Sequence, residues 1–276
     1  MKRALTLVVT AWLLSLFANA QNVLTGKEIY RINCKAVVQI KTNEGFGVGF
    51  IVSSDGTIMT ANHVVTTRES LFNKYASRIE VAIAGQSQPY QARPVTDNPS
   101  AEAVNSDSAV IKITASNPLP HLTLGSWDEV GVGDSLTILP SFPGLGCLLL
   151  QGIVSAKAVT QTGLGPNPVN VILFQVPIRN GFSGSPIFSA KGRVIGIQDT
   201  KVFGISPALD QQRKKWEANV SPTAPVTTTV HFGGADLGAS MLEMINNLDQ
   251  NLISGLGSGV DIAYAKEQQK AIPTKP

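Results

Sequence analysis

Short apolar runs recur along the chain, and each one is broken by Gly, Pro, Asn or Asp. Nine runs are rich in Val, Ile and Phe, residues that favour β-strands: 35–41, 46–53, 78–84, 108–113, 134–140, 150–159, 170–176, 186–190 and 193–198. Many short strands with turn residues between them are typical of β-sandwiches and β-barrels. The pattern therefore predicts an all-β fold and argues against alternating β-α-β units.

Two of these regions resemble each other. Residues 50–60 contain two apolar runs around Asp55-Gly56, and residues 186–197 contain two around Lys191-Gly192. A glycine at such a position predicts a β-hairpin, because glycine adopts the positive φ that tight hairpin turns require. The similarity suggests two related halves, which join near residues 117–125, where prolines interrupt the pattern.

Beyond Gln198 the pattern changes. Residues 204–225 are polar and contain proline, which predicts a long surface insertion, and residues 227–232 are a further strand candidate. Residues 238–253 carry apolar side chains at helical spacing, so a helix is expected there. Residues 254–276 are first rich in glycine and then polar, which predicts a frayed tail.

The N-terminus predicts export. Lys2 and Arg3 precede an apolar run over 4–17, and the small-residue ending Ala-Asn-Ala follows at 18–20. This combination is typical of a secretory signal peptide, here over residues 1–20, so the mature chain is expected in a periplasm or outside the cell. The run is short for a membrane span, which makes a retained anchor the weaker alternative. No later segment is long and apolar enough to span a membrane, so the mature chain is expected to have no span.

Charge and cysteine content exclude several classes of function. The chain has 22 Lys and Arg against 19 Asp and Glu, and loss of the signal peptide with its two basic residues leaves a mature charge near +1. That balance is not typical of a nucleic-acid-binding protein. His, Cys and carboxylates do not cluster at metal-ligand spacing, so we expect neither a metal nor a cofactor. Cys34 and Cys147 are compatible with a disulfide in an oxidising compartment or with two buried thiols. The sequence alone does not decide between these states, because a disulfide requires a strict geometry of the two cysteines.

Three residues are candidates for chemistry. Ser183 lies in the sequence NGFSGSPIF at 180–188, His63 follows a predicted strand, and Asp107 directly precedes the apolar run at 108–113. Taken singly, each has a structural interpretation: a turn serine, a hydrogen-bonded histidine and a strand-start aspartate. Together they form a possible catalytic set. A serine hydroxyl needs a base to take its proton, a neutral histidine suits that task, and a buried carboxylate orients the histidine.

The segments around these residues resemble the HtrA/Deg-type members of the trypsin-like serine protease superfamily. Similar stretches are GFGVGFIVSSDGTIMTANHVV (45–65), SDSAVIKI (106–113), VGVGDSLTILPSFPG (130–144) with GIVSA (152–156), NGFSGSPIFSAKGRVIGI (180–197) and FGGADLGASMLEMINNL (232–248). The last stretch resembles the closing strand and C-terminal helix of that family. The segments occur in the family's order over most of the chain, which makes the resemblance specific.

The resemblance implies a chymotrypsin-like fold of two packed antiparallel β-barrels with a short C-terminal helix. The implied organisation is a signal peptide over 1–20, an N-terminal barrel with His63 and Asp107 over 21–118, a C-terminal barrel with Ser183 and the closing helix over 119–253, and a flexible tail over 254–276. It also implies endopeptidase activity on protein or peptide substrates through an acyl-enzyme. Ser183 would attack, His63 would carry the proton, Asp107 would orient His63, and the backbone N–H groups of Gly181 and Ser183 would form the oxyanion hole. No particular oligomeric state is implied.

Differences from the family motif motivate one alternative. Phe182 stands where the family usually has Asn or Asp, and Ser185 replaces a glycine. A catalytically inactive relative that binds peptides in the same cleft would tolerate both. A serine esterase of another fold is a weaker alternative, because the Gly-x-Ser-x-Gly pattern is absent and the triad order differs. By position, Ile178 is expected to line the primary specificity pocket, with a preference for small or medium aliphatic side chains.

Overall fold

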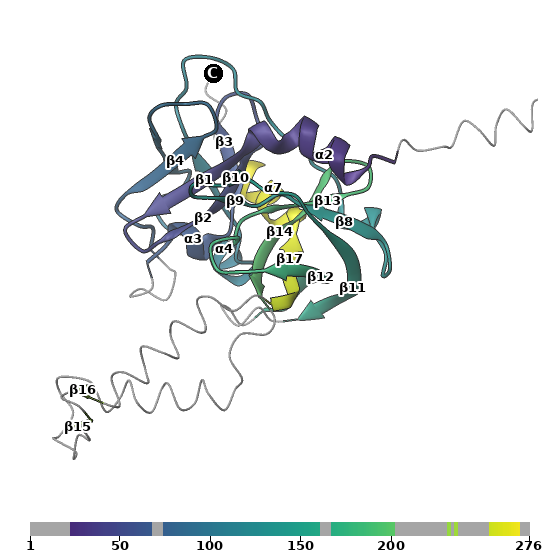
Figure 1. Ribbon diagram of the computed structural model, residues 1–276. Helices are drawn as coiled ribbons and strands as arrows, with labels where there is room; N and C mark the ends of the chain where they lie inside the picture. Colours follow the sequence, from purple (N-terminus) through teal and green to yellow (C-terminus); the bar gives the residue numbers. More distant parts are fainter. Residues whose placement is uncertain are drawn as a thin grey trace, which may run out of the picture.

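The computed structural model describes residues 23–67, 74–160, 167–201, 231–232, 235–236 and 254–270. Within them, two β-structures lie side by side: a seven-stranded sheet from the first half of the chain and a closed six-stranded barrel from the second (Figure 1). A short helix ends the described chain. This arrangement confirms the predicted all-β fold with two barrel-like sheets and a C-terminal helix.

The first sheet is antiparallel throughout, with the strand order β5-β4-β1-β2-β3-β7-β6. Its strands are β1 (Val37–Thr42), β2 (Phe46–Ile51), β3 (Thr57–Thr60), β4 (Ile79–Ile83), β5 (Tyr90–Gln91), β6 (Arg93–Pro94) and β7 (Ala109–Lys112). Two short helices, α3 (Asn62–Val65) and α4 (Ala101–Asn105), connect strands at one end of the sheet. The hairpin between β2 and β3 turns at Asp55-Gly56 as predicted, with Gly56 at a φ of 89°.

The second unit is a closed barrel with the strand order β11-β12-β17-β14-β13-β8. Its strands are β8 (Ser135–Ile138), β11 (Leu150–Thr160), β12 (Val169–Ile178), β13 (Pro186–Ser189), β14 (Val194–Lys201) and β17 (Ser254–Asp261). The described residues also form two small two-stranded ribbons, β9 (Ser141–Phe142) with β10 (Gly146–Cys147) and β15 (His231–Phe232) with β16 (Ala235–Asp236). Each of the nine predicted runs contains a strand, and the β13–β14 hairpin turns at Lys191-Gly192, with Gly192 at a φ of 70°.

The predicted flexible tail is wrong for residues 254–270. Residues 254–261 form β17, which pairs with β12 and β14 and closes the barrel, and α7 (Ile262–Lys270) follows it. The glycines fit this strand because the barrel leaves no room for side chains there. A Cβ at Gly257 would lie 2.5 Å from Phe174 Cε2, and one at Gly259 would lie 2.2 Å from Ile187 Cδ1. The strand that closes the barrel and the helix that follows it thus lie at 254–270, whereas the resemblance predicted them at 232–248, a stretch that mostly falls outside the described residues.

Other predictions fall outside the described residues. These are the signal peptide at 1–20, the insertion at 204–225 and the helix at 238–253. Of the strand candidate at 227–232, the last two residues form β15. Within the part of the chain that the structure describes, no helix is long and apolar enough to cross a membrane.

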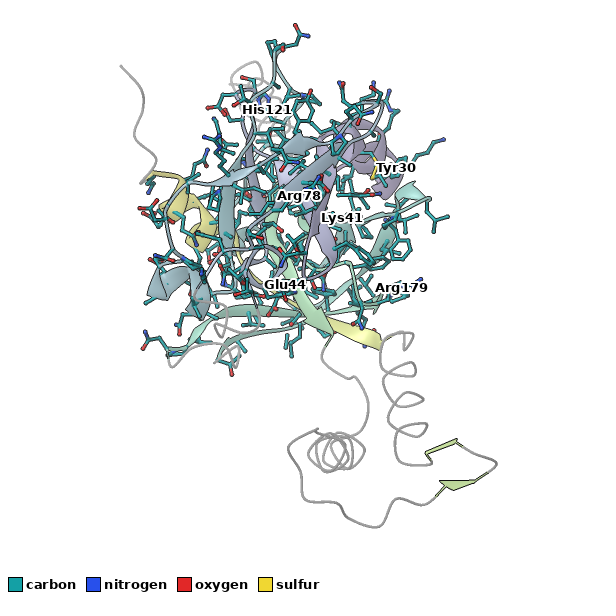
Figure 2. The ribbon with its side chains drawn as sticks, turned by 90° about the vertical axis from the view of Figure 1, so that its left-hand side faces the viewer. Tyr30, Lys41, Glu44, Arg78, His121 and Arg179 are labelled. Atoms are coloured by element: carbon teal, nitrogen blue, oxygen red, sulfur yellow. A yellow bond between two sulfur atoms is a disulfide. The ribbon has the colours of Figure 1, made fainter. Side chains whose placement is uncertain are left out.

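A helix and a disulfide hold the N-terminal segment. Helix α2 (Gly26–Asn33) begins with a reciprocal cap, in which the Thr25 hydroxyl accepts from the Glu28 amide and the Glu28 carboxylate accepts from the Thr25 amide. Cys34, in the 3₁₀ turn η1 (Cys34–Ala36), is bonded to Cys147 of β10 across 113 residues. Figure 2 shows this bond close to Tyr30, whose hydroxyl donates to the Cys147 carbonyl at 3.4 Å. Closing such a loop contributes about 4 to 5 kcal/mol in the chain-entropy account.

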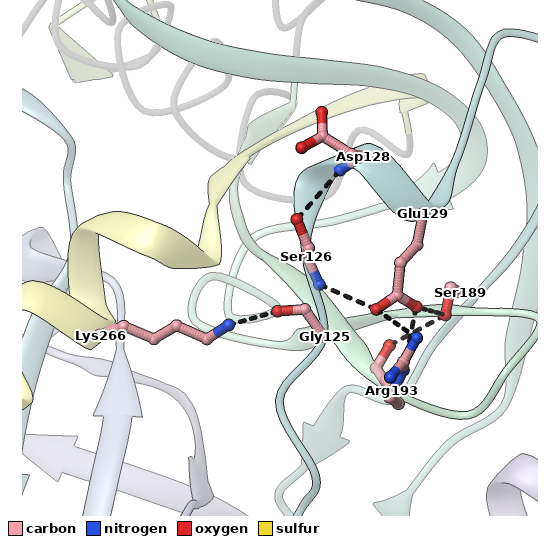
Figure 3. A network of polar contacts seen from close by, with 7 residues as sticks. All are labelled: Gly125, Ser126, Asp128, Glu129, Ser189, Arg193 and Lys266. Atoms are coloured by element: carbon pink, nitrogen blue, oxygen red, sulfur yellow. Dashed lines mark hydrogen bonds and ion pairs between the residues drawn. The ribbon is translucent and has the colours of Figure 1, made fainter.

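A polar network joins the connector, the segment between β7 and β8 that links the two units, to the barrel and to α7 (Figure 3). Glu129, at the end of the 3₁₀ turn η3 (Trp127–Glu129), accepts from Arg193 Nη2 at 2.8 Å and from the Ser189 hydroxyl at 2.9 Å. Both partners flank the β13–β14 hairpin. Lys266 of α7 donates to the Gly125 carbonyl, which lies in the connector just before η3. These contacts fix the C-terminal helix against the body of the protein.

Deletion of residues 254–276 tests the assignment of β17. The deletion removes the strand between β12 and β14, so both lose their hydrogen-bond partner and the barrel opens. We expect the shortened protein to lose cooperative thermal unfolding, followed by circular dichroism. Deletion of 271–276 alone, which leaves β17 and α7 intact, is the control. A cooperative wild-type-like transition after the longer deletion would contradict the assignment.

Candidate active site

His63 is placed by the short helix α3, which follows β3 directly. The helix is fastened to the neighbouring connection, because the Asn62 amide donates to the Asp107 carbonyl at 3.1 Å. The Thr66 hydroxyl donates to the Asn62 carbonyl at 2.8 Å and closes the helical turn. The His63 side chain is 30% exposed, so the ring is partly accessible to solvent.

Asp107 occupies an unusual backbone position between α4 and β7. Its φ of 45° is the one positive value at a non-glycine residue among the described residues. Aspartate tolerates this left-handed conformation better than most residues, and such conformations are concentrated at functional sites. The side chain is fully buried. The predicted position, directly before an apolar strand, is confirmed, since β7 begins two residues later.

The structure joins His63 and Asp107 by two hydrogen bonds. Asp107 Oδ2 lies 2.6 Å from the ring Nδ1, and Asp107 Oδ1 accepts from the His63 backbone N–H at 2.9 Å. A carboxylate is an acceptor, so this pairing selects the tautomer that carries its proton on Nδ1 and its lone pair on Nε2. Burial raises the pKa of Asp107, but the charge and hydrogen bonds of His63 outweigh it and hold that pKa below its ordinary value.

Ser183 lies in a pair of consecutive turns. The Phe182 amide donates to the Arg179 carbonyl at 3.3 Å, and the Ser185 amide donates to the Phe182 carbonyl at 3.1 Å. The third residue of each turn is a glycine, Gly181 and Gly184, and both have a φ of 89°. A four-residue turn with positive φ at its third position is type II, which requires glycine there. The glycines on either side of the serine thus have a backbone function.

Two backbone amides in this double turn have no partner in the described part of the chain. Neither the Gly181 N–H nor the Ser183 N–H donates a hydrogen bond to any described residue. Ser183 is itself partly exposed, and only Phe182 separates the two amides in the sequence. Backbone donors left open beside a serine are suited to bind a negatively charged oxygen.

Phe182 packs into the barrel and leaves the double turn intact. The side chain is 5% exposed and belongs to the core of the second unit. Its ring meets the edge of Phe142 at a centroid distance of 6.2 Å, and Phe142 in turn meets Phe46 at 5.5 Å. The aromatic side chain at this position fills the core behind the turn, and both turn hydrogen bonds are formed in its presence.

The double turn is clamped against the sheet that carries His63. The Val48 amide of β2 donates to the Ser183 carbonyl at 2.8 Å. A Cβ built on Gly47 would lie 3.0 Å from that carbonyl oxygen and 2.6 Å from Cγ2 of Val64, the residue after His63. On the other side, the Gly184 amide donates to the Gln198 carbonyl at 2.7 Å. Ser183 is therefore held where the two β-structures meet, next to α3.

The sequence comparisons agree with this architecture. The sequence profile of the trypsin-like peptidase domain matches residues 47–197, more than half of the chain. The chain belongs to this family. Among its curated relatives is a "Probable periplasmic serine endoprotease DegP-like" of Pseudomonas putida, 35% identical over 162 residues, which covers 58% of this chain and 30% of the relative. A protein of the same description from Hahella chejuensis is 36% identical over 153 residues, with coverages of 55% and 29%. The matches thus span less than a third of each relative.

Solved structures show the same fold. The "HtrA-type protease AlgW with tripeptide" superposes with a TM-score of 0.59 at 23% identity, covering 90% of this chain and 63% of that one. The crystal structure of Deg5 superposes with a TM-score of 0.52 at 24% identity, with coverages of 62% and 82%. At these identities the likeness concerns the fold, which is that of the trypsin-like peptidases.

One residue of this trypsin-like peptidase site was missed by the sequence analysis. Asp199 of β14 is 7% exposed, and its carboxyl group lies close to the side chains of the predicted pair. One side-chain nitrogen or oxygen each of His63, Asp107 and Asp199 lies within 4.8 Å of the other two. The 2.6 Å contact between His63 and Asp107 is a hydrogen-bond distance and leaves no space for an ion between those two atoms.

The expectation for Ile178 is wrong. The side chain is 1% exposed and packs in the core of the barrel, where Phe174 is its neighbour in the same cluster. A side chain that is fully covered by the protein cannot line a pocket that receives substrate. The strand position suggested an accessible residue, but β12 turns this side chain inward.

A comparison of two glycines tests how tightly the double turn is packed. Alanine at a positive φ costs about 1 to 2 kcal/mol. At Gly181 the new Cβ would also lie 2.3 Å from Phe46 Cε2, whereas at Gly133, with a φ of 91°, it would meet nothing within 4 Å. We expect Gly181→Ala to lower the free energy of unfolding more than Gly133→Ala, as measured by urea denaturation. Equal losses would show that Phe46 does not restrict the turn.

Proposed function

We propose that this chain is an exported serine endopeptidase that hydrolyses peptide bonds through Ser183, His63 and Asp107. The observation that carries the proposal is the double hydrogen bond between His63 and a fully buried Asp107, formed beside the turn that presents Ser183. A histidine with a purely structural role does not need a buried carboxylate that bonds to both its ring and its backbone N–H. A histidine that accepts and releases a proton during catalysis needs such a carboxylate, because its ring must stay in one orientation.

In the proposed reaction, Ser183 Oγ attacks the carbonyl carbon of a peptide bond while His63 Nε2 takes the hydroxyl proton. The tetrahedral intermediate then expels the amine, to which His63 returns the proton, and an acyl-serine remains. Water repeats the sequence: His63 takes its proton, the oxygen attacks the ester carbon, and Ser183 leaves with the proton restored. Asp107 stabilises the protonated ring that exists between these transfers.

The oxyanion of each tetrahedral intermediate would be bound by the backbone N–H groups of Gly181 and Ser183. Both are open donors in the described chain, and the two type II turns fix their direction. Fixed donors cost no reorganisation when the charge develops, and loss of one such donor typically lowers kcat by about 10²- to 10³-fold. This explains why the sequence has glycine at 181.

Three features support export and a protein substrate. Residues 1–20 have the pattern of a signal peptide. The curated relatives are described as periplasmic serine endoproteases. The Cys34–Cys147 disulfide agrees with an oxidising compartment. We therefore infer that the mature protein acts on proteins or peptides in a periplasm or outside the cell.

A fluorophosphonate probe tests the nucleophile. Such probes react with a serine only when a base and an oxyanion site activate it. We expect the wild type to be labelled at Ser183, identified by peptide mass spectrometry, and both Ser183→Ala and His63→Ala to lose labelling by at least about 10³-fold. The exposed residues Ser54 and His121 provide matched controls, and their alanine variants should be labelled like the wild type.

The absence of labelling in a folded wild-type protein would contradict the proposal. It would favour a protein that binds peptides in the cleft without cleaving them, the function that the substitutions at Phe182 and Ser185 suggest. Labelling at another serine would also contradict the assignment of Ser183. Thermal unfolding of each variant, followed by circular dichroism, separates a lost nucleophile from a lost fold.

A further inference from the structure

The pairing between β14 and β17 is irregular where Asp199 lies. Gln198 is paired with Gly259, but the next recorded pair is Lys201 with Gly257, so the register shifts between them. Such bulges change the direction of a side chain and are common beside active sites. Both Gln198 and Asp199 are buried here, at 1% and 7% exposure, although neighbours in a regular strand point to opposite faces. The irregularity thus allows the Asp199 side chain to face the connection between α4 and β7 that carries Asp107.

Asp199 and Asp107 form a contact between two buried carboxyl groups. Carboxyl oxygens of the two side chains lie within 4.8 Å of each other. Two carboxylates at such a distance cannot hydrogen-bond to each other, because neither has a proton to donate. Two negative charges at this distance inside a protein also repel strongly. One of the two groups must therefore carry a proton.

The surroundings decide which group carries it. Both Asp107 oxygens face hydrogen-bond donors of His63, which favour the charged form. Asp199 has no such support: burial and the negative charge of Asp107 both raise its pKa well above the ordinary value. Asp261, on the adjacent strand, accepts from Asn170 and from the Ala263 amide. His63 is another titratable side chain within 4.8 Å of Asp199, and its ring Nδ1 is hydrogen-bonded to Asp107.

We infer that Asp199 is a positioning residue of this site, which in its neutral form donates a hydrogen bond to the Asp107 carboxylate. This donor acts from the barrel side, while His63 acts from the first sheet. Asp107 has a strained backbone and is fixed between them. The Asp107 carboxylate is thus fixed by hydrogen bonds from both β-structures, one of them donated by the proton of Asp199. This inference rests on the proposed function for its catalytic consequence, but the protonation of Asp199 can be measured without activity.

Loss of that proton sets an upper pH limit for this contact. The pKa of Asp199 in the folded protein lies above its unfolded value of 3.8, so the folded protein holds a proton that the unfolded chain releases. The contribution of Asp199 to stability is complete at pH values below the unfolded pKa and is lost as the pH rises through the folded pKa. The free energy of unfolding of the wild type should therefore fall relative to that of Asp199→Asn as the pH rises above about 4.

Infrared spectroscopy at neutral pH measures the protonation directly. A neutral carboxylic acid has a C=O stretch distinct from that of a carboxylate. We expect this band in the wild type and its loss in Asp199→Asn, which keeps a donor N–H of similar size. Asp128→Asn, which changes an exposed aspartate, is the control and should keep the band. A wild-type spectrum in which Asp199→Asn removes no such band would overturn the inference, whether or not the protein is active.

The rate of fluorophosphonate labelling at Ser183 tests the positioning. We expect Asp199→Asn and Asp199→Ser, which can still donate, to react within a few-fold of the wild type. Asp199→Ala, which cannot donate, should react about ten- to a hundredfold more slowly. The decline of the wild-type rate that accompanies deprotonation of Asp199 should be absent in Asp199→Asn. Equal rates in folded Asp199→Ala and Asp199→Asn would overturn the positioning role.

The two proposals fail in different ways. An unlabelled but folded wild type that shows the acid band would contradict the peptidase function and support the neutral state of Asp199. Labelling at Ser183 without the acid band would support the peptidase function and overturn the inference about Asp199.

Discussion

The burial of the Asp107 carboxylate is the constraint on which the site depends. A charge removed from water must be paired and hydrogen-bonded, or it is expelled or neutralised. Asp107 is fully buried, with a backbone φ of 45°, and both its oxygens face His63. The histidine ring can thus hold one tautomer and one orientation without help from substrate. A second buried acid, Asp199, has a carboxyl oxygen within 4.8 Å of one of Asp107.

The rest of the molecule holds the serine turn against this pair. Two type II turns leave the Gly181 and Ser183 amides without a partner among the described residues, and the Ser183 carbonyl is hydrogen-bonded to β2 of the opposite sheet. Phe182 fixes the turn from behind by filling the barrel core. Asn or Asp at that position would need polar partners inside the barrel, whereas an aromatic side chain gains its stabilisation from burial and edge-to-face contacts.

Much of the fold could be predicted from the sequence because strands and hairpins are local signals. Alternating apolar runs located nine strands, and glycine at 56 and 192 located two turns. β17 could not be predicted in this way, because its glycines are required by Phe174 and Ile187 of other strands, and such packing is invisible in a local pattern. Asp199 was missed for the same reason: a bulge and a partner 92 residues away give it its position. His63 and Asp107 were paired from the order of motifs, and the structure brings them together.

Proton NMR of the His63 ring tests the central claim most directly, because the claim concerns one hydrogen bond. In protein with ¹⁵N-labelled histidine, a proton held between Nδ1 and the Asp107 carboxylate should give a strongly deshielded, slowly exchanging resonance at neutral pH. The account predicts this resonance in the wild type and in His121→Ala, and its loss in Asp107→Asn. A folded wild type without the resonance, or a resonance that survives in Asp107→Asn, would contradict it.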